Sequence, residues 1–511
     1  MIVMSNLKLQ KSCLCGCIFT LPFTVTSVHL PLVGGNLPEF FLLVGVIFGF
    51  LEYLVTPLSL DKNELCGFKF LGLMFLWAVI SSIIGVVLYP YYSVIDLIQM
   101  ENFKNFYDNL ASFSICLDDL SAIKWWLSYK AVKYSFTYVF FSFVISFWIY
   151  HLYKDRWQEG ISDIKRTLAG ICIVLICYSV IEVGYLFGFV FCKNLLALIN
   201  PIYMDIQSNH GWWPPLFWTQ SQLRSMFPEP SFFGIFAAMT IPFFMGDFYN
   251  KKSVNMCFFI LIYTFLVVML VLSKARTGLI LFLIEFFLII CWSLIYRFHQ
   301  WKRLILLLSC TGVAFLAGLG LISQFQPVSA QDALQSNQVN VESYVSDNIA
   351  SAVGNKRSNN ARRANVMATF RTGLDSPLLG IGINMRNEAV AEHLTEEEKE
   401  NGEVSLWMRY MDEKGPLKSG FPNLNQFSVV FAEQGIIGLI LFIIPLGYIF
   451  YMIAKRMDIL RDCRIACLCI SFAGLVIAFL ANEAKLSVFI IIGLLICALL
   501  NYKEEKEDFN E

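Results

Sequence analysis

The sequence predicts an all-α, polytopic membrane protein with about twelve transmembrane helices and one large, partly helical loop outside the membrane. The first observation is composition: 57% of the 511 residues are hydrophobic and 15% are charged, against about 25% charged in soluble domains. The second is a series of apolar runs of about 20 residues, the length that crosses a bilayer. The third is one long hydrophilic stretch between such runs, residues 324–424, which we call the island.

The apolar runs divide the chain into four parts. Residues 1–323 hold nine candidate spans, with outer loops at 89–132 and 192–230, and the island follows. Residues 425–501 hold three more spans, and residues 502–511 form a cytoplasmic tail whose mixed, mostly acidic composition is typical of a solvated segment. The candidate spans are 13–33, 38–57, 66–88, 133–151, 167–191, 231–248, 254–272, 276–296, 303–323, 426–453, 463–481 and 484–501.

The basic residues between the spans predict the orientation, because Lys and Arg gather in the cytoplasmic loops of membrane proteins. A cytoplasmic N-terminus puts the basic clusters at 154–166, 251–252, 297–303 and 455–464 on the inside, and the opposite orientation puts them all outside. We therefore expect both termini in the cytoplasm and the island on the outer face. The net charge of −1 indicates little about partners, and no nucleic-acid partner is expected.

Arg224 and Glu229 stand directly before a candidate span, with prolines on both sides of the carboxylate. Because proline restricts the backbone, this arrangement fixes the two side chains near the outer surface. A purely structural alternative is a salt bridge in which Glu229 lies at the positive N-terminal end of the next helix. The segment is therefore a candidate site with a structural alternative.

Arg276 lies in a very short outer turn between two spans, Ser273 to Gly278. A charge at this depth is costly unless it is paired, reaches the surface along its own side chain, or serves a ligand. Within the island, residues 360–372 predict a short helix that carries Arg362 and Arg363. A solvated helix face is the alternative for those two arginines.

Several arginines from separate parts of the chain thus fall on the outer face. Guanidinium groups bind multivalent anions such as a lipid-linked diphosphate with paired hydrogen bonds. Gly380 and Gly382 follow the predicted helix and permit tight turns or a close approach of backbone to a ligand. The sequence has no zinc-type Cys/His spacing, no phosphate-binding P-loop and no Ser/His/Asp signature, so we expect no metal and no cofactor.

The ordered motifs resemble those of the O-antigen polymerase and ligase superfamily of bacterial envelope proteins, the Wzy- and WaaL-like membrane glycosyltransferases. The resemblance covers the topology of nearly the whole chain. Each motif is short, and their order and spacing support the resemblance. The motifs are Arg224 with Glu229-Pro230-Ser231 and Gly234, Ser273-Lys274-Ala275-Arg276-Thr277-Gly278, Arg362 followed by Pro377-Leu378-Leu379-Gly380-Ile381-Gly382, and Asn425 followed by Ala432-Glu433-Gln434-Gly435.

The resemblance implies a metal-independent, inverting glycosyl transfer on undecaprenyl-diphosphate-linked sugars at the periplasmic face of the bacterial inner membrane. In that case Arg224, Arg276 and Arg362 hold the diphosphate and stabilise the charge on the leaving group. Glu229 is the candidate to accept the proton of the attacking sugar hydroxyl. The remaining residues of the implied substrate-binding set are Arg363, Gly380, Gly382 and Asn425.

Three functions are compatible with these observations. Ligase-like members of the superfamily begin their last motif with a His-Asn pair, whereas Leu424 precedes Asn425 here, which favours a polymerase of repeat units over a ligase. A transporter or flippase for lipid-linked sugars is the alternative of another class, and it predicts charges within several spans. The partners implied are undecaprenyl-diphosphate-linked glycans and membrane lipid, with a chain-length regulator and a flippase as candidates.

Overall fold

The computed structural model describes residues 2–30, 33–55, 61–96, 103–113, 115, 117–205, 216, 220–249, 256–328, 344 and 357–502. Those residues form helices and connecting loops, and no strand occurs among them. Most of the first half of the island and nearly all of the predicted tail at 502–511 lie outside this set. Within it, the prediction of an all-α, polytopic membrane protein is confirmed.

Nine helical segments in the described part of the chain are long and apolar enough to cross a membrane. They belong to α2 (Leu37–Val55), α3 (Lys62–Leu88), α5 with α6 (Asp119–Val139 and Ile145–Tyr153), α7 (Trp157–Leu186), α9 (Pro230–Met245), α10 (Met256–Ser273), α11 (Arg276–Tyr296), α12 (Trp301–Ile322) and α19 (Gln426–Lys455). Shorter apolar helices are α8 (Val190–Tyr203), α20 (Cys463–Ala478) and α21 (Leu486–Asn501).

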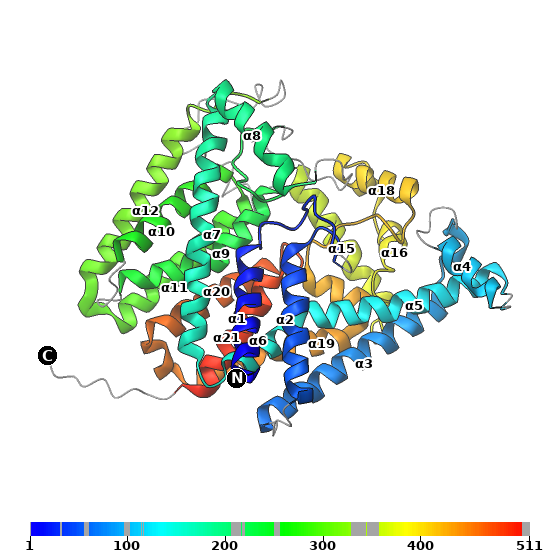
Figure 1. Ribbon diagram of the computed structural model, residues 1–511. Coiled ribbons are helices and arrows are strands. Elements are labelled where there is room, and N and C mark those ends of the chain that lie inside the picture. The colour runs from blue at the N-terminus through cyan, green and yellow to red at the C-terminus, as the bar shows by residue number, and fades with distance from the viewer. Residues whose placement is uncertain are drawn as a thin grey trace.

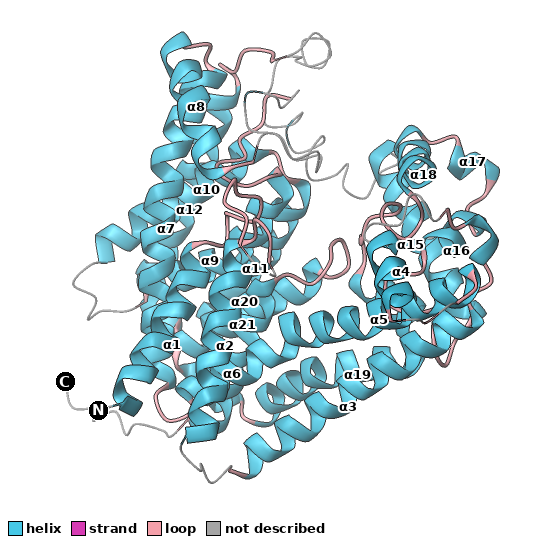
Figure 2. Ribbon diagram, turned by 45° about the vertical axis from the view of Figure 1, so that its right-hand side comes forward, coloured by secondary structure: helices cyan, strands magenta, loops and turns pink. Residues whose placement is uncertain are grey.

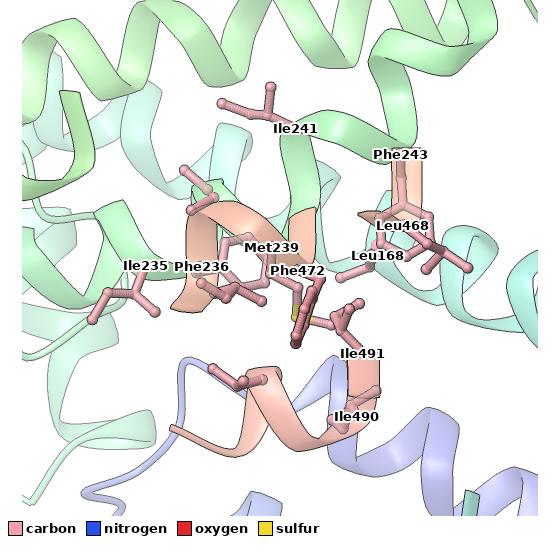
Figure 3. Packing of buried hydrophobic residues seen from close by; sticks show 14 of the residues in the cluster. Leu168, Ile235, Phe236, Met239, Ile241, Phe243, Leu468, Phe472, Ile490 and Ile491 are labelled. Atoms are coloured by element: carbon pink, nitrogen blue, oxygen red, sulfur yellow. The ribbon is translucent and has the colours of Figure 1, made fainter. Parts of the chain in front are cut away.

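The helix α9 forms the centre of the bundle. It is apolar all round its circumference, as expected for a helix surrounded by other helices. Figure 3 shows its side chains packed against those of α7, α20 and α21. The Ser471 hydroxyl of α20 also donates a hydrogen bond to the Met239 carbonyl at 3.1 Å. The first residues of α9 therefore have a fixed position in the molecule.

The first helix differs from the predicted span at 13–33. The helix α1 covers Ile2–Phe19 and is followed by irregular backbone up to α2 in the described residues. Lys11 of α1 forms an ion pair with Glu159 of α7 at 2.5 Å, and Gln10 donates to Glu52 of α2 at 2.7 Å. Because these polar side chains are paired between helices, the helix begins well before the apolar run that predicted it.

The segment predicted as a loop at 89–132 is largely helical in its described part. It contains α4 (Phe103–Ser112) and most of α5, which continues through a π-helical turn (Phe140–Val144) into α6. Its Trp126 packs with Val86 of α3, Phe103 of α4 and Met385 of the island in a small apolar cluster. Lysines interrupt the apolar sequence of α5, which is why a search for continuous apolar runs found only its second half.

The described part of the island forms a small helical layer. Its helices are α15 (Arg357–Asp375), α16 (Asn387–Glu392), α17 (Glu396–Lys399) and α18 (Gly402–Lys414). They enclose an apolar cluster of their own, which includes Ala364, Val390, Val404 and Phe421. Figures 1 and 2 show this layer over α5 and α19, on the side of the bundle opposite to the start of α1. We call this the island side.

Candidate active site

The loop before α9 holds Arg224 in a fully buried position. The Glu182 carboxylate of α7 accepts hydrogen bonds from the backbone N–H groups of Arg224 and Ser225, at 3.0 and 2.8 Å. The Arg224 Nη1 donates to the Pro228 carbonyl at 2.7 Å, and its side chain is 0% exposed. Burial lowers the pKa of the Arg224 guanidinium, and the carboxylates of Glu182 and Glu229 oppose this shift. In this structure Arg224 therefore shapes the loop that leads to Glu229.

Glu229 occupies the N-cap position of α9 without a side-chain capping hydrogen bond, and Pro230 occupies the first turn, where its missing N–H costs nothing. The Ser231 hydroxyl donates to the Glu229 carboxylate at 3.0 Å. The carboxylate thus has a hydroxyl partner and lies at the positive end of the helix dipole, where negative charge is stabilised. The structural role anticipated for Glu229, a charge at the helix N-terminus, is present, and its role as a base stays a prediction.

The starts of α9 and α11 meet at a pair of glycines. A methyl group placed on Gly234 would lie 2.7 Å from the Gly278 Cα, which leaves no room for any side chain. The Leu223 N–H also donates to the Leu272 carbonyl at the end of α10, at 3.1 Å. This crossing brings together the loop that contains Arg224, the helix start that contains Glu229 and the turn that contains Arg276.

Arg276 connects this corner to the island. Its Nη1 donates to the side-chain oxygen of Asn359, in the first turn of α15, at 3.2 Å. Arg362 is three residues further on and therefore shares the helix face of Asn359; its side chain is partly buried, and that of Arg363 is exposed. The structure thus brings the first turn of α15 into contact with Arg276, and the diphosphate role of Arg276 and Arg362 stays a prediction.

Gly380 and Gly382 lie against an interruption in α19. Gly435 within that helix has φ +67°, outside the helical range. The neighbouring loop of the island pairs with the interrupted backbone: the Ile381 N–H donates to the Ala432 carbonyl at 2.9 Å, and the Ile436 N–H donates to the Pro377 carbonyl at 2.8 Å. A Cβ on Gly380 would lie 2.3 Å from the Glu433 carbonyl carbon.

Gly380 is thus required for close packing of backbone on backbone, whereas a Cβ on Gly382 would first meet the Met385 sulfur, at 3.1 Å. Gly380 and Gly382 have φ values of +72° and +101°, which glycine adopts readily. Asn425 also has a structural role, because its side chain caps α19 by accepting from the Ser428 N–H at 3.0 Å and donates to the Leu480 carbonyl at 3.2 Å. Substrate contacts by these residues stay predictions.

A second polar cluster, which the sequence did not single out, lies beside the interruption in α19. Arg386 is 4% exposed, and its Nε lies 3.4 Å from the Glu433 carboxylate of α19. Its Nη2 donates to the Phe421 carbonyl at 2.9 Å and to the Asn423 side chain. Asn423 in turn donates to Glu483, in the turn between α20 and α21, at 3.2 Å.

This cluster extends to the start of α9. Lys485 forms an ion pair with Glu483, and its Nζ lies 4.3 Å from the centroid of the Phe232 ring in the first turn of α9. Burial would raise the pKa of the Glu483 carboxyl, but Lys485, Asn423 and Arg386 together hold it below its usual range. The carboxylate is therefore ionised at neutral pH and joins Lys485 to Asn423.

Sequence signals for this second cluster existed but were weak. Glu433 falls within the last motif, and Glu483 and Lys485 occupy a short turn between two apolar runs. Charges in such a turn usually reach solvent along their own side chains. In the part of the chain that the structure describes, no group of three or more His, Cys, Asp or Glu residues is arranged to hold a metal ion.

An apolar cavity of about 380 Å³ lies below the turn that contains Arg276, between α10, α11 and α12. Leu279, one helical turn after Arg276, forms part of its wall, together with Val271, Phe282 and Phe315. The Tyr344 hydroxyl of the island donates to the Val271 carbonyl at 2.7 Å. Arg276 thus lies one helical turn from the wall of a cavity suited to hydrocarbon.

The fold and this site define a polytopic membrane protein with basic and acidic side chains gathered where an extramembrane helical layer meets the spans. Residues 259–443 match the family model described as O-antigen ligase (Wzy_C), which supports the resemblance of the chain to the O-antigen polymerase and ligase superfamily. The match runs from α10 to α19, so it includes Arg276, Arg362 and the loop at 377–382 but not Arg224 or Glu229. No curated protein and no solved structure matches the chain.

Proposed function

We propose that this protein polymerises undecaprenyl-diphosphate-linked oligosaccharide repeat units into a surface polysaccharide at the periplasmic face of the bacterial inner membrane, with both termini in the cytoplasm. The observation that carries the proposal is the contact of Arg276 with the first turn of α15, at the corner where α9 and α11 begin. On this proposal, guanidinium groups from the spans and the island act at this corner together with the Glu229 carboxylate.

A lipid carrier with a diphosphate group and an isoprenoid chain accounts for both the arginines and the apolar cavity at this corner. A diphosphate requires cationic donors, and Arg276 with Arg362 supplies them at the end of the spans. An isoprenoid chain requires an apolar environment, and the cavity between α10, α11 and α12 begins one helical turn from Arg276. A lipid whose tail occupied this cavity would present its diphosphate to the arginines.

The chemistry then follows from the charges. The hydroxyl of an acceptor sugar attacks the anomeric carbon of the lipid-linked sugar, and the bond from that carbon to the diphosphate oxygen breaks. The diphosphate leaves with the bonding electron pair, and the arginines stabilise the added charge. Glu229 accepts the proton of the attacking hydroxyl, and Ser231 keeps its carboxylate oriented.

A ligase, which transfers finished polymer to another acceptor, is the second candidate, and the description of the matching family model favours it. The leucine before Asn425 favours the polymerase. Loss of a polymerase leaves single repeat units on the surface, whereas loss of a ligase leaves long polymer on the carrier lipid. A gel of surface and carrier-linked glycans from a strain lacking the gene therefore separates the two functions.

The site is tested by Arg276→Ala in the full-length protein, reconstituted with a lipid-linked repeat unit. We expect elongation to fall by about 100-fold or more, the usual effect of removing a donor that stabilises a developing anion. Arg409→Ala is the matched control, because this arginine on α18 of the same layer is 63% exposed and lies outside the candidate site. Elongation at the normal rate by Arg276→Ala, with equal amounts of membrane-inserted protein, would exclude the diphosphate role.

A further inference from the structure

A polar cavity of about 220 Å³ lies on the island side, between α5 and the island. One wall is formed by the middle turns of α5, with Trp126, Lys130 and Tyr134. The other wall is formed by the loop at 383–385 and the turn at 414–418 that follows α18. None of these residues belongs to the site described above, although Arg386 follows the loop directly.

Three lysines and one carboxylate line this cavity. Lys130, Lys414 and Lys418 contribute ammonium groups, and Asp96 contributes the carboxylate. The cavity therefore has an excess of positive charge, which favours an anionic occupant. A lysine ammonium group recognises a carboxylate or a phosphate through charge-assisted hydrogen bonds.

The lysines are held in place by the structure around them. The Lys130 Nζ lies 4.8 Å from the centroid of the Trp126 ring, and the Lys414 Nζ lies 5.0 Å from that of Tyr410. Such cation–π contacts fix the ammonium groups along the aromatic side chains. Asn387 donates to the Pro416 carbonyl at 2.7 Å and to the Ser419 carbonyl at 3.2 Å, which fixes the turn between Lys414 and Lys418.

The cavity is also tied to the candidate active site. The Asn384 N–H donates to the Glu433 carboxylate at 3.1 Å, and the same carboxylate pairs with Arg386. The Ile383 N–H donates to the Ser82 hydroxyl of α3 at 3.2 Å. The loop at 383–385 is therefore both a wall of the cavity and a hydrogen-bond partner of Glu433.

We infer that this cavity binds an acidic sugar residue, such as a hexuronate, of the glycan that the enzyme extends. The lysines supply the charge, the Tyr134 ring supplies an apolar face of the kind that sugar rings pack on, and the backbone of the two loops supplies further polar groups. The inference rests on the proposed function for the origin of the glycan, and it adds that the repeat unit contains a negatively charged sugar.

Binding of oligosaccharides to the full-length protein in phosphatidylcholine nanodiscs tests this inference without any lipid-linked donor. The probes are trigalacturonate and its neutral counterpart galactotriose. We expect trigalacturonate to bind more tightly, by about tenfold or more in Kd. The double variant Lys414→Ala/Lys418→Ala should lose that preference, and Lys414→Arg/Lys418→Arg should keep it. The matched control is Lys399→Ala, on α17 of the same layer, which should bind as the natural protein does.

Equal binding of the two trisaccharides, or trigalacturonate binding that is unchanged in the double alanine variant, would overturn the inference. If inorganic phosphate displaced the probe as effectively as trigalacturonate does, the cavity would be a general anion site. If trigalacturonate binding were lost in phosphatidylglycerol nanodiscs, the cavity would be a lipid-headgroup site. Either result also overturns the inference. Absence of trigalacturonate binding with normal elongation contradicts this inference alone, whereas binding without elongation contradicts the proposed polymerase.

Discussion

Arg386 and Glu433 form an ion pair that is almost closed to solvent and joins the island to α19. Removal of one member of such a pair leaves the other charge buried, at a cost of about 3–5 kcal/mol. We therefore expect Arg386→Ala to lower the thermal unfolding temperature of the detergent-solubilised protein strongly. The double variant Arg386→Met/Glu433→Gln should lose less than Arg386→Ala, because it leaves no unpaired charge.

The control for this comparison is Arg363→Ala, whose side chain is exposed on the same layer. An unfolding temperature for Arg386→Ala that equals that of the control would show that the ion pair contributes nothing to stability. The double variant also reports on function: if it is stable but inactive, the pair positions the loop at 383–385 for catalysis.

The sequence indicated some of the charged residues at this site but did not indicate how the others pair. Arg224, Glu229 and Arg276 stand next to span boundaries, so topology alone brings them to one face. Arg386 and Glu433 are separated along the chain by most of the island's described helices, and nothing local indicates that they pair. The buried Arg224 side chain donates a hydrogen bond to the Pro228 carbonyl of its own loop, and its diphosphate role stays a prediction.

The crossing of α9 and α11 sets the geometry of the site at the scale of helices. Gly278→Ala would place a methyl group 2.6 Å from the Gly234 Cα and would force the two helices apart. We expect this variant to insert into the membrane normally and to lose most of its elongation activity, measured on equal amounts of purified protein. Gly320→Ala is the control, since a methyl group at that position of α12 would meet nothing within 4 Å.

If Gly278→Ala were as active as Gly320→Ala, the contact of the two helix starts would not be needed for the site.

The hydrophobic pattern predicted α9, α10 and α11 closely, because each is a single apolar run between charged or proline-containing turns. It predicted α1 and α5 less well. Both helices contain lysines that the fold accommodates, Lys11 by pairing with Glu159 and Lys130 by lying along Trp126.

The whole molecule is predicted to have one orientation. The start of α1 and the end of α21 lie on the side opposite to the island (Figure 1). Reporter domains fused on the two sides should therefore give opposite results. An alkaline phosphatase domain, which is active only outside the cytoplasm, should be active when inserted after Lys399 and inactive when fused after Tyr502. Fluorescent protein fusions at the same positions should give the reverse pattern, and activity of the phosphatase at Tyr502 would refute the orientation.

Hydropathy and charge predict the spans and their orientation, because both patterns belong to one segment at a time. The interruption of α19 at Gly435 could not be predicted in this way, because it depends on contacts between two separate segments. The carbonyl and N–H groups left by the break are paired by residues 377–382 of the island, and without that loop the same break in a span would be costly.

This pairing makes two of the island's contacts with the spans differ in strength. The strand of backbone at 377–382 completes a helix of the membrane part, so it is fixed for as long as that helix is intact. The start of α15, by contrast, is held to the spans by the side-chain contact of Asn359 with Arg276. If the island moves to admit a lipid-linked glycan, we therefore expect it to turn about residues 377–382 and to open at the start of α15.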